Sequence, residues 1–170
     1  MRRTRSRTVA GILAAIVVLA IVPAASAALR AARTPADCTR SQLNVRSNGQ
    51  EGTLGTIHGA WVFTNRSATD CTLNGYPDLQ LYGRTGRPLP TTVQTTLPPA
   101  PSAVTLAPGG SGTFLSSYSE VISGSARCPT SAVIEITAPH AAGSHFLPAE
   151  LHACTGEIQV SAVEAGVHHP

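Results

Sequence analysis

The sequence predicts an all-β domain of the β-sandwich class, and three observations favour this fold. Short runs rich in Val, Ile, Leu, Thr and aromatic residues recur along the chain, separated by Gly, Pro, Asn and Ser. Apolar and polar residues alternate within several of these runs, as in strands that bury one face. After residue 27, no stretch keeps the helical period of about 3.6 residues for long enough to predict a helix.

The spacing of these runs predicts about nine strands. The strand at residues 133–137 has the clearest alternation, with Ile134 and Ile136 on one face and Glu135 on the other. Residues 158–162 carry an apolar side chain at every second position. In chain order, we expect strands at residues 42–47, 57–65, 72–74, 79–82, 91–97, 104–106, 112–118, 132–137 and 157–163.

The strand at residues 57–65 ends in a turn with its own chemistry. Trp61 and Phe63 project to one face, so we favour a place in the core for both over an exposed binding role for Trp61. Asn65 is placed to cap the following turn with its side-chain amide. Further turns are predicted at residues 83–86 and 107–110, where Gly tolerates positive φ.

Residues 87–102 contain five prolines. Pro98 and Pro101 form a PxxP pattern, which would suit a polyproline ligand segment. We favour the alternative, a long connection that crosses from one sheet to the other.

The N-terminus has the three parts of an export signal. Residues 1–7 are basic, residues 9–22 form an apolar run of 14 residues, and Ala25-Ser26-Ala27 is a cleavage site of small residues. The run is short of the ~20 residues that span a bilayer, which favours a cleaved signal over a membrane anchor. The first cysteine, Cys38, lies too far after the predicted cut for a lipid anchor. We therefore expect a secreted protein, extracellular or associated with the cell wall, with no stable membrane anchor.

The chain divides into a signal peptide at residues 1–27, a flexible leader at 28–37, one β-sandwich domain at 38–165 and a tail at 166–170. A chain of this length favours one domain. The part after residue 27 is long enough to bury roughly two thirds of its unfolded surface in a single core.

The charge balance excludes two classes of function. All 12 basic residues are Arg, and four of them lie in the first 27 residues, which contain no Asp or Glu. The remaining chain has 8 Arg and 9 acidic residues, and 8 minus 9 gives −1 before His is counted. A nucleic-acid partner is therefore not expected, because it requires clustered basic residues on the folded part. A chain without Lys also cannot supply the lysine of a P-loop.

All four cysteines, Cys38, Cys71, Cys128 and Cys154, lie after the export signal, in a compartment that permits disulfides. Four cysteines allow three pairings, and spacing does not decide among them. We favour Cys38 with Cys71 and Cys128 with Cys154, which close loops of 33 and 26 residues. A structural zinc site is the rival interpretation, but the chain has no Cys-x-x-Cys or Cys-x-x-His pair.

The sequence lacks the local signatures of catalysis. There is no G-x-S-x-G elbow and no Ser-x-x-Lys motif, and the nine acids are scattered singly. Ser, His and Asp are present, but a triad without a local motif is only a statement of composition. We therefore expect no enzymatic activity and no cofactor, with a hydrolase as the third hypothesis.

Metal binding is the second hypothesis for function. His140, His145 and His152 fall between Cys128 and Cys154, and imidazole is a ligand that suits Zn and Cu(II). Against a metal site, the sequence has no H-E-x-x-H motif and no His-x-His pair.

Three segments carry a resemblance to a known family. They are VFTNRS at residues 62–67, CTLNGYP at 71–77 and VTLAPGGS at 104–111, followed by two later cysteines. Their order resembles the actinobacterial domain-of-unknown-function 4232 family (DUF4232), over nearly all of residues 38–163. The resemblance implies an exported or envelope protein and an immunoglobulin-like antiparallel β-sandwich with two disulfides. It implies no catalytic or binding residues.

We accordingly expect a secreted, non-enzymatic β-sandwich module whose partner is a protein or a glycan in the cell envelope or outside the cell. The alternative is an extracytoplasmic Zn or Cu protein that uses the loop histidines. Because the domain is close to neutral, we expect it to bind its partner through neutral or aromatic surface rather than through charged residues.

Overall fold

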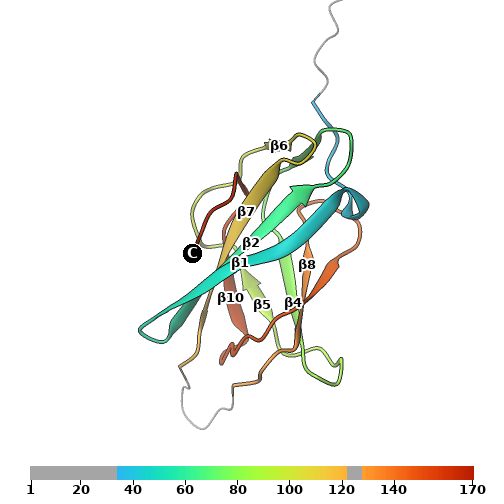
Figure 1. Cartoon of the computed structure of the whole chain (residues 1–170). Helices are drawn as coiled ribbons and strands as arrows, with labels where there is room; N and C mark the ends of the chain where they lie inside the picture. Colours follow the sequence, from blue (N-terminus) through green and yellow to red (C-terminus); the bar gives the residue numbers. More distant parts are fainter. Residues whose placement is uncertain (1–33, 122–127) are drawn as a thin grey trace, which may run out of the picture. The chain divides into compact units, whose positions relative to one another are not determined.

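The structure, a computed structural model, describes residues 34–121 and 128–170. The predicted signal peptide and most of the leader lie outside these residues. The described part is a β-sandwich (Figure 1). Its elements are η1 (Arg40–Gln42), a short 3-10 turn, and the strands β1 (Leu43–Thr53), β2 (Thr56–Asn65), β3 (Cys71–Leu73), β4 (Asp78–Tyr82), β5 (Thr92–Gln94), β6 (Val104–Leu106), β7 (Ser111–Ser119), β8 (Val133–Thr137), β9 (His145–Pro148), β10 (Glu157–Val160) and β11 (Glu164–Ala165).

The larger sheet has the strand order β1-β2-β7-β10-β5, and β11 pairs with β7. β2 and β7 pair along most of their lengths, from Thr56 opposite Ser119 to Thr64 opposite Ser111. β5 runs parallel to β10, which departs from the antiparallel arrangement that we expected. The reason is that β5 lies on the proline-rich connection, which crosses from β4 to the larger sheet instead of turning back as a hairpin.

The second sheet has the order β4-β8-β9, and β3 and β6 form a separate two-stranded sheet. Alternation along β4 and β8 decides which side chains enter the core. Leu81 and Ile134 lie opposite each other and are both buried. Tyr82 and Glu135 therefore point to the outer face of this sheet.

The core lies between the two main sheets and is built from the apolar faces predicted from the sequence. Trp61 and Phe63 are fully buried, as expected, and the Phe63 ring lies 5.6 Å from that of Phe114 on β7. The polar atom of Trp61 is satisfied, since its Nε1 donates a hydrogen bond of 3.0 Å to Ser116 Oγ. The contact between the two phenylalanine rings and the hydrogen bond of the indole both join β2 to β7 within the core.

β1 is longer than predicted and continues to Thr53. It forms a hairpin with β2 that extends as an arm in Figure 1. The hairpin turn consists of Leu54 and Gly55, with φ of 51° and 80°, the left-handed conformation that a two-residue turn of the I′ type requires. This extension was not predicted, because residues 48–52 contain no β-branched or aromatic side chain.

The last residues of the chain lie against the outer face of the larger sheet. Thr113 Oγ1 on β7 donates a hydrogen bond to Gly166 O (2.7 Å) and accepts one from His168 N (3.2 Å). Asn48 Nδ2 on β1 donates to His168 O (2.8 Å). Residues 166–168 of the predicted tail are thus held on the sheet, which helps to explain why the outward-facing Val62 is buried.

Asn65 forms a junction between distant segments at the end of β2. Its side chain is fully buried, and its Nδ2 donates hydrogen bonds to Thr69 O (2.8 Å) and Leu106 O (2.9 Å). Its Oδ1 accepts hydrogen bonds from the backbone and the hydroxyl of Ser67. The amide therefore caps the turn after β2, as predicted, and also ties that turn to β6.

The Asn65 backbone joins the same junction. Its N–H donates to Gly110 O (2.9 Å) and its carbonyl accepts a hydrogen bond from Gly109 N (2.7 Å). Gly109 adopts a φ of 77°, so the predicted turn at residues 107–110 needs glycine there. The FTN and LAPGG segments, which are 41 or more residues apart in sequence, are thus one structural unit.

Replacing the Asn65 amide should destabilise the fold. In Asn65→Ala, the Leu106 carbonyl loses a buried hydrogen bond, and the Thr69 carbonyl and the Ser67 N–H each lose one hydrogen bond, so we expect the free energy of unfolding to fall by about 2–4 kcal/mol. Urea denaturation measures this loss. Asn44→Ala is the control, because Asn44 is exposed on β1 and should change stability by less than about 0.5 kcal/mol. Equal effects of the two substitutions would show that the junction does not stabilise the fold.

Candidate functional site

The four predicted cysteines form two disulfides in the pairing that we favoured. Cys38 joins Cys71, and both are buried at one end of the sandwich. The backbone alongside is paired as well, since Cys38 N donates to Thr72 O and Thr72 N donates to Ala36 O, each at 2.9 Å. This bridge fixes the start of the domain against β3 and offers no free thiol for chemistry.

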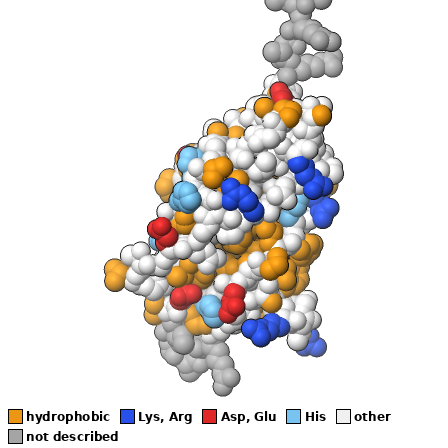
Figure 2. Space-filling model, viewed as in Figure 1, with side chains coloured by type: hydrophobic (Ala, Val, Ile, Leu, Met, Phe, Trp, Pro, Cys, Tyr) orange, Lys and Arg blue, Asp and Glu red, His pale blue; other side chains and the backbone are white. Residues whose placement is uncertain are grey.

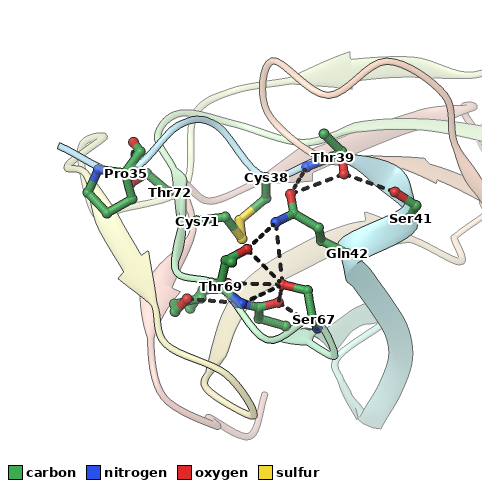
Figure 3. Close-up of a disulfide and its surroundings, with 11 residues drawn as sticks. Pro35, Cys38, Thr39, Ser41, Gln42, Ser67, Thr69, Cys71 and Thr72 are labelled. Atoms are coloured by element: carbon green, nitrogen blue, oxygen red, sulfur yellow. Dashed lines mark hydrogen bonds between the residues drawn. A yellow bond between two sulfur atoms is a disulfide. The ribbon is translucent and has the colours of Figure 1, made fainter. Parts of the chain in front are cut away.

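Polar side chains surround this disulfide (Figure 3). Gln42 accepts a hydrogen bond from Thr39 N (2.9 Å) through Oε1 and donates to the hydroxyls of Ser67 and Thr69 through Nε2. These contacts connect η1 to the turn that Asn65 caps. The polar groups of this cluster hydrogen-bond to one another. We therefore assign the cluster to the framework of the fold and not to a binding site.

The second disulfide joins Cys128 to Cys154. Both residues are partly exposed, and the bridge closes a loop that includes β8 and β9. It therefore constrains the second sheet from its ends rather than from the core.

The structure places the three candidate metal ligands on different parts of this loop. His140 is exposed in the turn after β8, His145 begins β9, and His152 follows β9. Among the described residues, no group of three or more His, Cys, Asp or Glu side chains is placed to hold a metal ion. His140, His145 and His152 are therefore not brought together as one ligand set.

His145 has an unusual environment for a residue near the surface. Its Nε2 is buried and has no hydrogen-bond partner among the described residues. Burial lowers the pKa of His145, and the positive charges of Arg40 and Arg66 lower it further. Arg40 is held beside this histidine, because its Nε donates a hydrogen bond of 2.6 Å to Ser144 O. The imidazole thus contributes to packing in its neutral form.

His152 lies between a hydroxyl and a carboxylate, an arrangement that resembles a catalytic triad. Its Nδ1 is 3.1 Å from Thr130 Oγ1, and its Nε2 is 3.6 Å from Glu150 Oε1. The acid of a working triad is buried and hydrogen-bonded to the imidazole. Here the Glu150 side chain is 66% exposed, and 3.6 Å is too long for a hydrogen bond. The pair is a solvated surface contact.

The outer face of the β4-β8-β9 sheet carries two aromatic side chains side by side. Phe146 on β9 is 60% exposed, and its ring centroid lies 6.0 Å from that of Tyr82 on β4. Glu135 on β8 lies in register with Phe146, and its Oε2 accepts a hydrogen bond of 2.6 Å from the Tyr82 hydroxyl. This hydrogen bond to a carboxylate raises the pKa of Tyr82. We call Tyr82, Glu135 and Phe146 the aromatic face.

A shallow hollow of about 340 Å³ lies at the end of the same sheet. Its volume is in the lower part of the range for small-molecule sites. Ala132 links it to the aromatic face, since its N–H donates a hydrogen bond of 2.8 Å to Tyr82 O. The residues that line the hollow are Arg84, Ser131, Ala132, Pro148, Ala149 and Glu150.

Sequence reasoning missed the aromatic face. In the alternation of residues 79–82, Tyr82 and the buried Leu81 point to different faces of the strand. This signal could have identified Tyr82 as outward-facing. Phe146 carried no such signal, because the four residues of β9 are too few for a clear alternation and no strand was predicted there.

Charged side chains do not gather into a binding surface on the face of the molecule drawn in Figure 2. Acidic and basic side chains form small, separate groups among uncharged surface. Within residues 34–121 and 128–170, no helix is long and apolar enough to cross a membrane.

The fold and the aromatic face together define a disulfide-linked β-sandwich domain with an exposed aromatic surface on its smaller main sheet. The chain belongs to the family described as Domain of unknown function (DUF4232), whose family model matches residues 38–164. This match confirms the resemblance seen in the three sequence segments. Searches of the curated proteins and of the solved structures found no match.

The lowered pKa of His145 predicts a specific pH dependence of stability. Below the ordinary pKa of 6.5, the unfolded chain binds this proton more readily than the folded chain. The free energy of unfolding should therefore fall as the pH drops through 6.5, and this component should level off below the folded pKa. Urea denaturation of the unmodified protein and of His145→Gln between about pH 7.5 and pH 5 measures it.

The stability difference between the two proteins isolates His145 from other titrating groups. His58→Gln, a change at an exposed histidine on β2, is the matched control for the loss of an imidazole. A profile that His145→Gln also leaves unchanged would contradict the assignment.

Proposed function

We propose that this chain is a secreted, non-enzymatic β-sandwich module that binds a protein or glycan partner in the cell envelope or outside the cell. Membership of the DUF4232 family and two disulfides in an all-β domain are compatible with this function. Disulfides persist in oxidising compartments, which agrees with the export signal in residues 1–27.

One observation carries the proposal: on the aromatic face the Phe146 ring is largely exposed beside the half-buried Tyr82. The Phe146 ring takes no part in the core and is 60% exposed, whereas Leu81 and Ile134 on the other face of the sheet are buried in the core. Rigid aromatic side chains are enriched where proteins bind partners, because they offer large contact areas at a small cost in conformational entropy. Their place on paired strands, and not on a loop, holds the surface in a fixed shape.

The polar groups support a binding role over a catalytic one. The Ser131 hydroxyl, at the hollow, donates to Ala149 O and accepts a hydrogen bond from Leu151 N, so it is fixed in a structural role. The Thr130, His152 and Glu150 side chains lack the buried acid that a triad requires. Neither arrangement supplies an activated nucleophile.

The secretion part of the proposal predicts the mass of the mature protein. The full chain, expressed in an actinobacterial host, should be recovered from the culture medium with Ala28 at its N-terminus and no free thiol. Intact-mass spectrometry with and without reduction measures both features. Recovery of a protein that still begins at Met1, or that is confined to the cytosol, would contradict secretion.

The binding part predicts retention on cell envelopes. The purified secreted protein should bind isolated actinobacterial cell walls, and Phe146→Ala should reduce the bound fraction at least about fivefold, because central aromatic contacts carry much of a binding energy. Leu54→Ala is the matched control, since Leu54 is a fully exposed apolar residue on the β1–β2 turn. Absence of retention, or equal retention of both variants, would contradict a role of the aromatic face.

A further inference from the structure

The aromatic face has the geometry of a fixed, shallow V. The planes of the Tyr82 and Phe146 rings are inclined at 55°, with their centroids 6.0 Å apart. Tyr82 cannot rotate freely, because its hydroxyl is held by Glu135 on the strand between the two rings. The V therefore presents two ring surfaces at a set angle, with a carboxylate between them.

The hydrogen-bonding groups around the rings are mainly acceptors. The Tyr82 hydroxyl occupies one position on Glu135, whereas a carboxylate accepts up to about four hydrogen bonds. Gln80 lies beside Glu135 in the pairing of β4 with β8. Its Nε2 donates to Leu81 O and Leu89 O, which fixes the amide. A ligand that suits this rim is rich in hydrogen-bond donors.

The backbone of β8, the strand between the two rings, has no free groups for strand addition. β8, which carries Glu135, is paired with β4 on one side and with β9 on the other. Its N–H and C=O groups are therefore used within the sheet, and an added strand could join this sheet only at β4 or β9, beside the rings and not over them. The apolar part consists of two rings and not of a groove that would accept a helix.

The charge of the surface further limits the class of ligand that it could bind. Glu135 is negative and lies between the rings, so an anionic ligand would meet repulsion at the centre of the face. A neutral ligand with both apolar and hydroxyl surfaces meets complementary groups. Pyranose sugars combine these properties, because their C–H faces pack on the electron-rich faces of aromatic rings while their hydroxyls donate to acceptors.

We propose that the aromatic face binds a neutral oligosaccharide, with sugar rings packed on Tyr82 and Phe146 and hydroxyl groups donating hydrogen bonds to Glu135. The adjacent hollow of about 340 Å³ extends the site, and its Arg84 and Glu150 side chains supply a donor and an acceptor for a neighbouring sugar unit. This inference rests on the proposed binding function and assigns it a ligand class and a site.

Titration with defined sugars tests the inference. The probes are soluble oligomers of glucose, in α-linked and β-linked forms, and of N-acetylglucosamine, added to the purified secreted protein and followed by calorimetry and by NMR shifts. At least one oligomer should bind, with shifts centred on β4, β8 and β9. Phe146→Ala should weaken this binding at least about tenfold, and Leu54→Ala should change it less than about twofold.

Two further variants separate ring contacts from the carboxylate. Tyr82→Phe keeps the ring but loses the hydroxyl that holds Glu135, so binding should weaken about threefold, less than with Phe146→Ala. Glu135→Leu removes the acceptor and should weaken binding about tenfold. Because these side chains are on the outer face, all variants should unfold near the urea midpoint of the parent protein, which excludes misfolding as the cause.

The outcomes distinguish this inference from the proposed function. If no oligomer binds, while cell-wall retention persists and is abolished by protease treatment of the walls, the partner is a protein and the oligosaccharide inference is wrong. If an oligomer binds and Phe146→Ala leaves its affinity unchanged, the aromatic face is not the site. If the protein binds neither cell walls nor oligomers, both the oligosaccharide inference and the proposed function are wrong.

Discussion

The buried amide of Asn65 connects the turn after β2 with β6, and its backbone pairs with the glycine turn before β7. Two segments that are 41 residues apart in sequence thereby share one end of the sandwich, beside the Cys38–Cys71 disulfide. A buried amide with all its partners in place specifies one arrangement, because any shift would leave a polar group unsatisfied in the core. The FTN and LAPGG segments therefore build a structural frame within the DUF4232 domain.

Parts of this frame could be predicted from the sequence, because the residue patterns that indicate them are local. Asn65 at a strand end predicted a capped turn, and the turn around Gly109 predicted positive φ. Alternation likewise predicted the core places of Trp61, Phe63 and Ile134. The parallel pairing of β5 with β10 and the extension of β1 could not be predicted, because both depend on pairing between segments and not on the composition of either one.

The candidate site could not be predicted from the sequence for the same reason. Tyr82 and Phe146 are 146 minus 82, or 64, residues apart, and they become neighbours only because β4 and β9 both pair with β8. The loop histidines show the converse. His140, His145 and His152 are close in sequence, yet a turn and a strand separate them, so proximity along the chain predicted a shared role that the structure does not assemble.

The frame and the aromatic face occupy structurally independent positions, and this has a consequence for specificity. Asn65 is fully buried and satisfies several partners, so nearly any substitution there leaves polar groups unpaired. Phe146 is mostly exposed, and its outward position on β9 contributes little to the core. Outward positions on β4, β8 and β9 can therefore exchange side chains at a small cost in stability. The same sandwich can therefore carry different outward side chains on this sheet, because its stability depends on the buried residues and not on the outward ones.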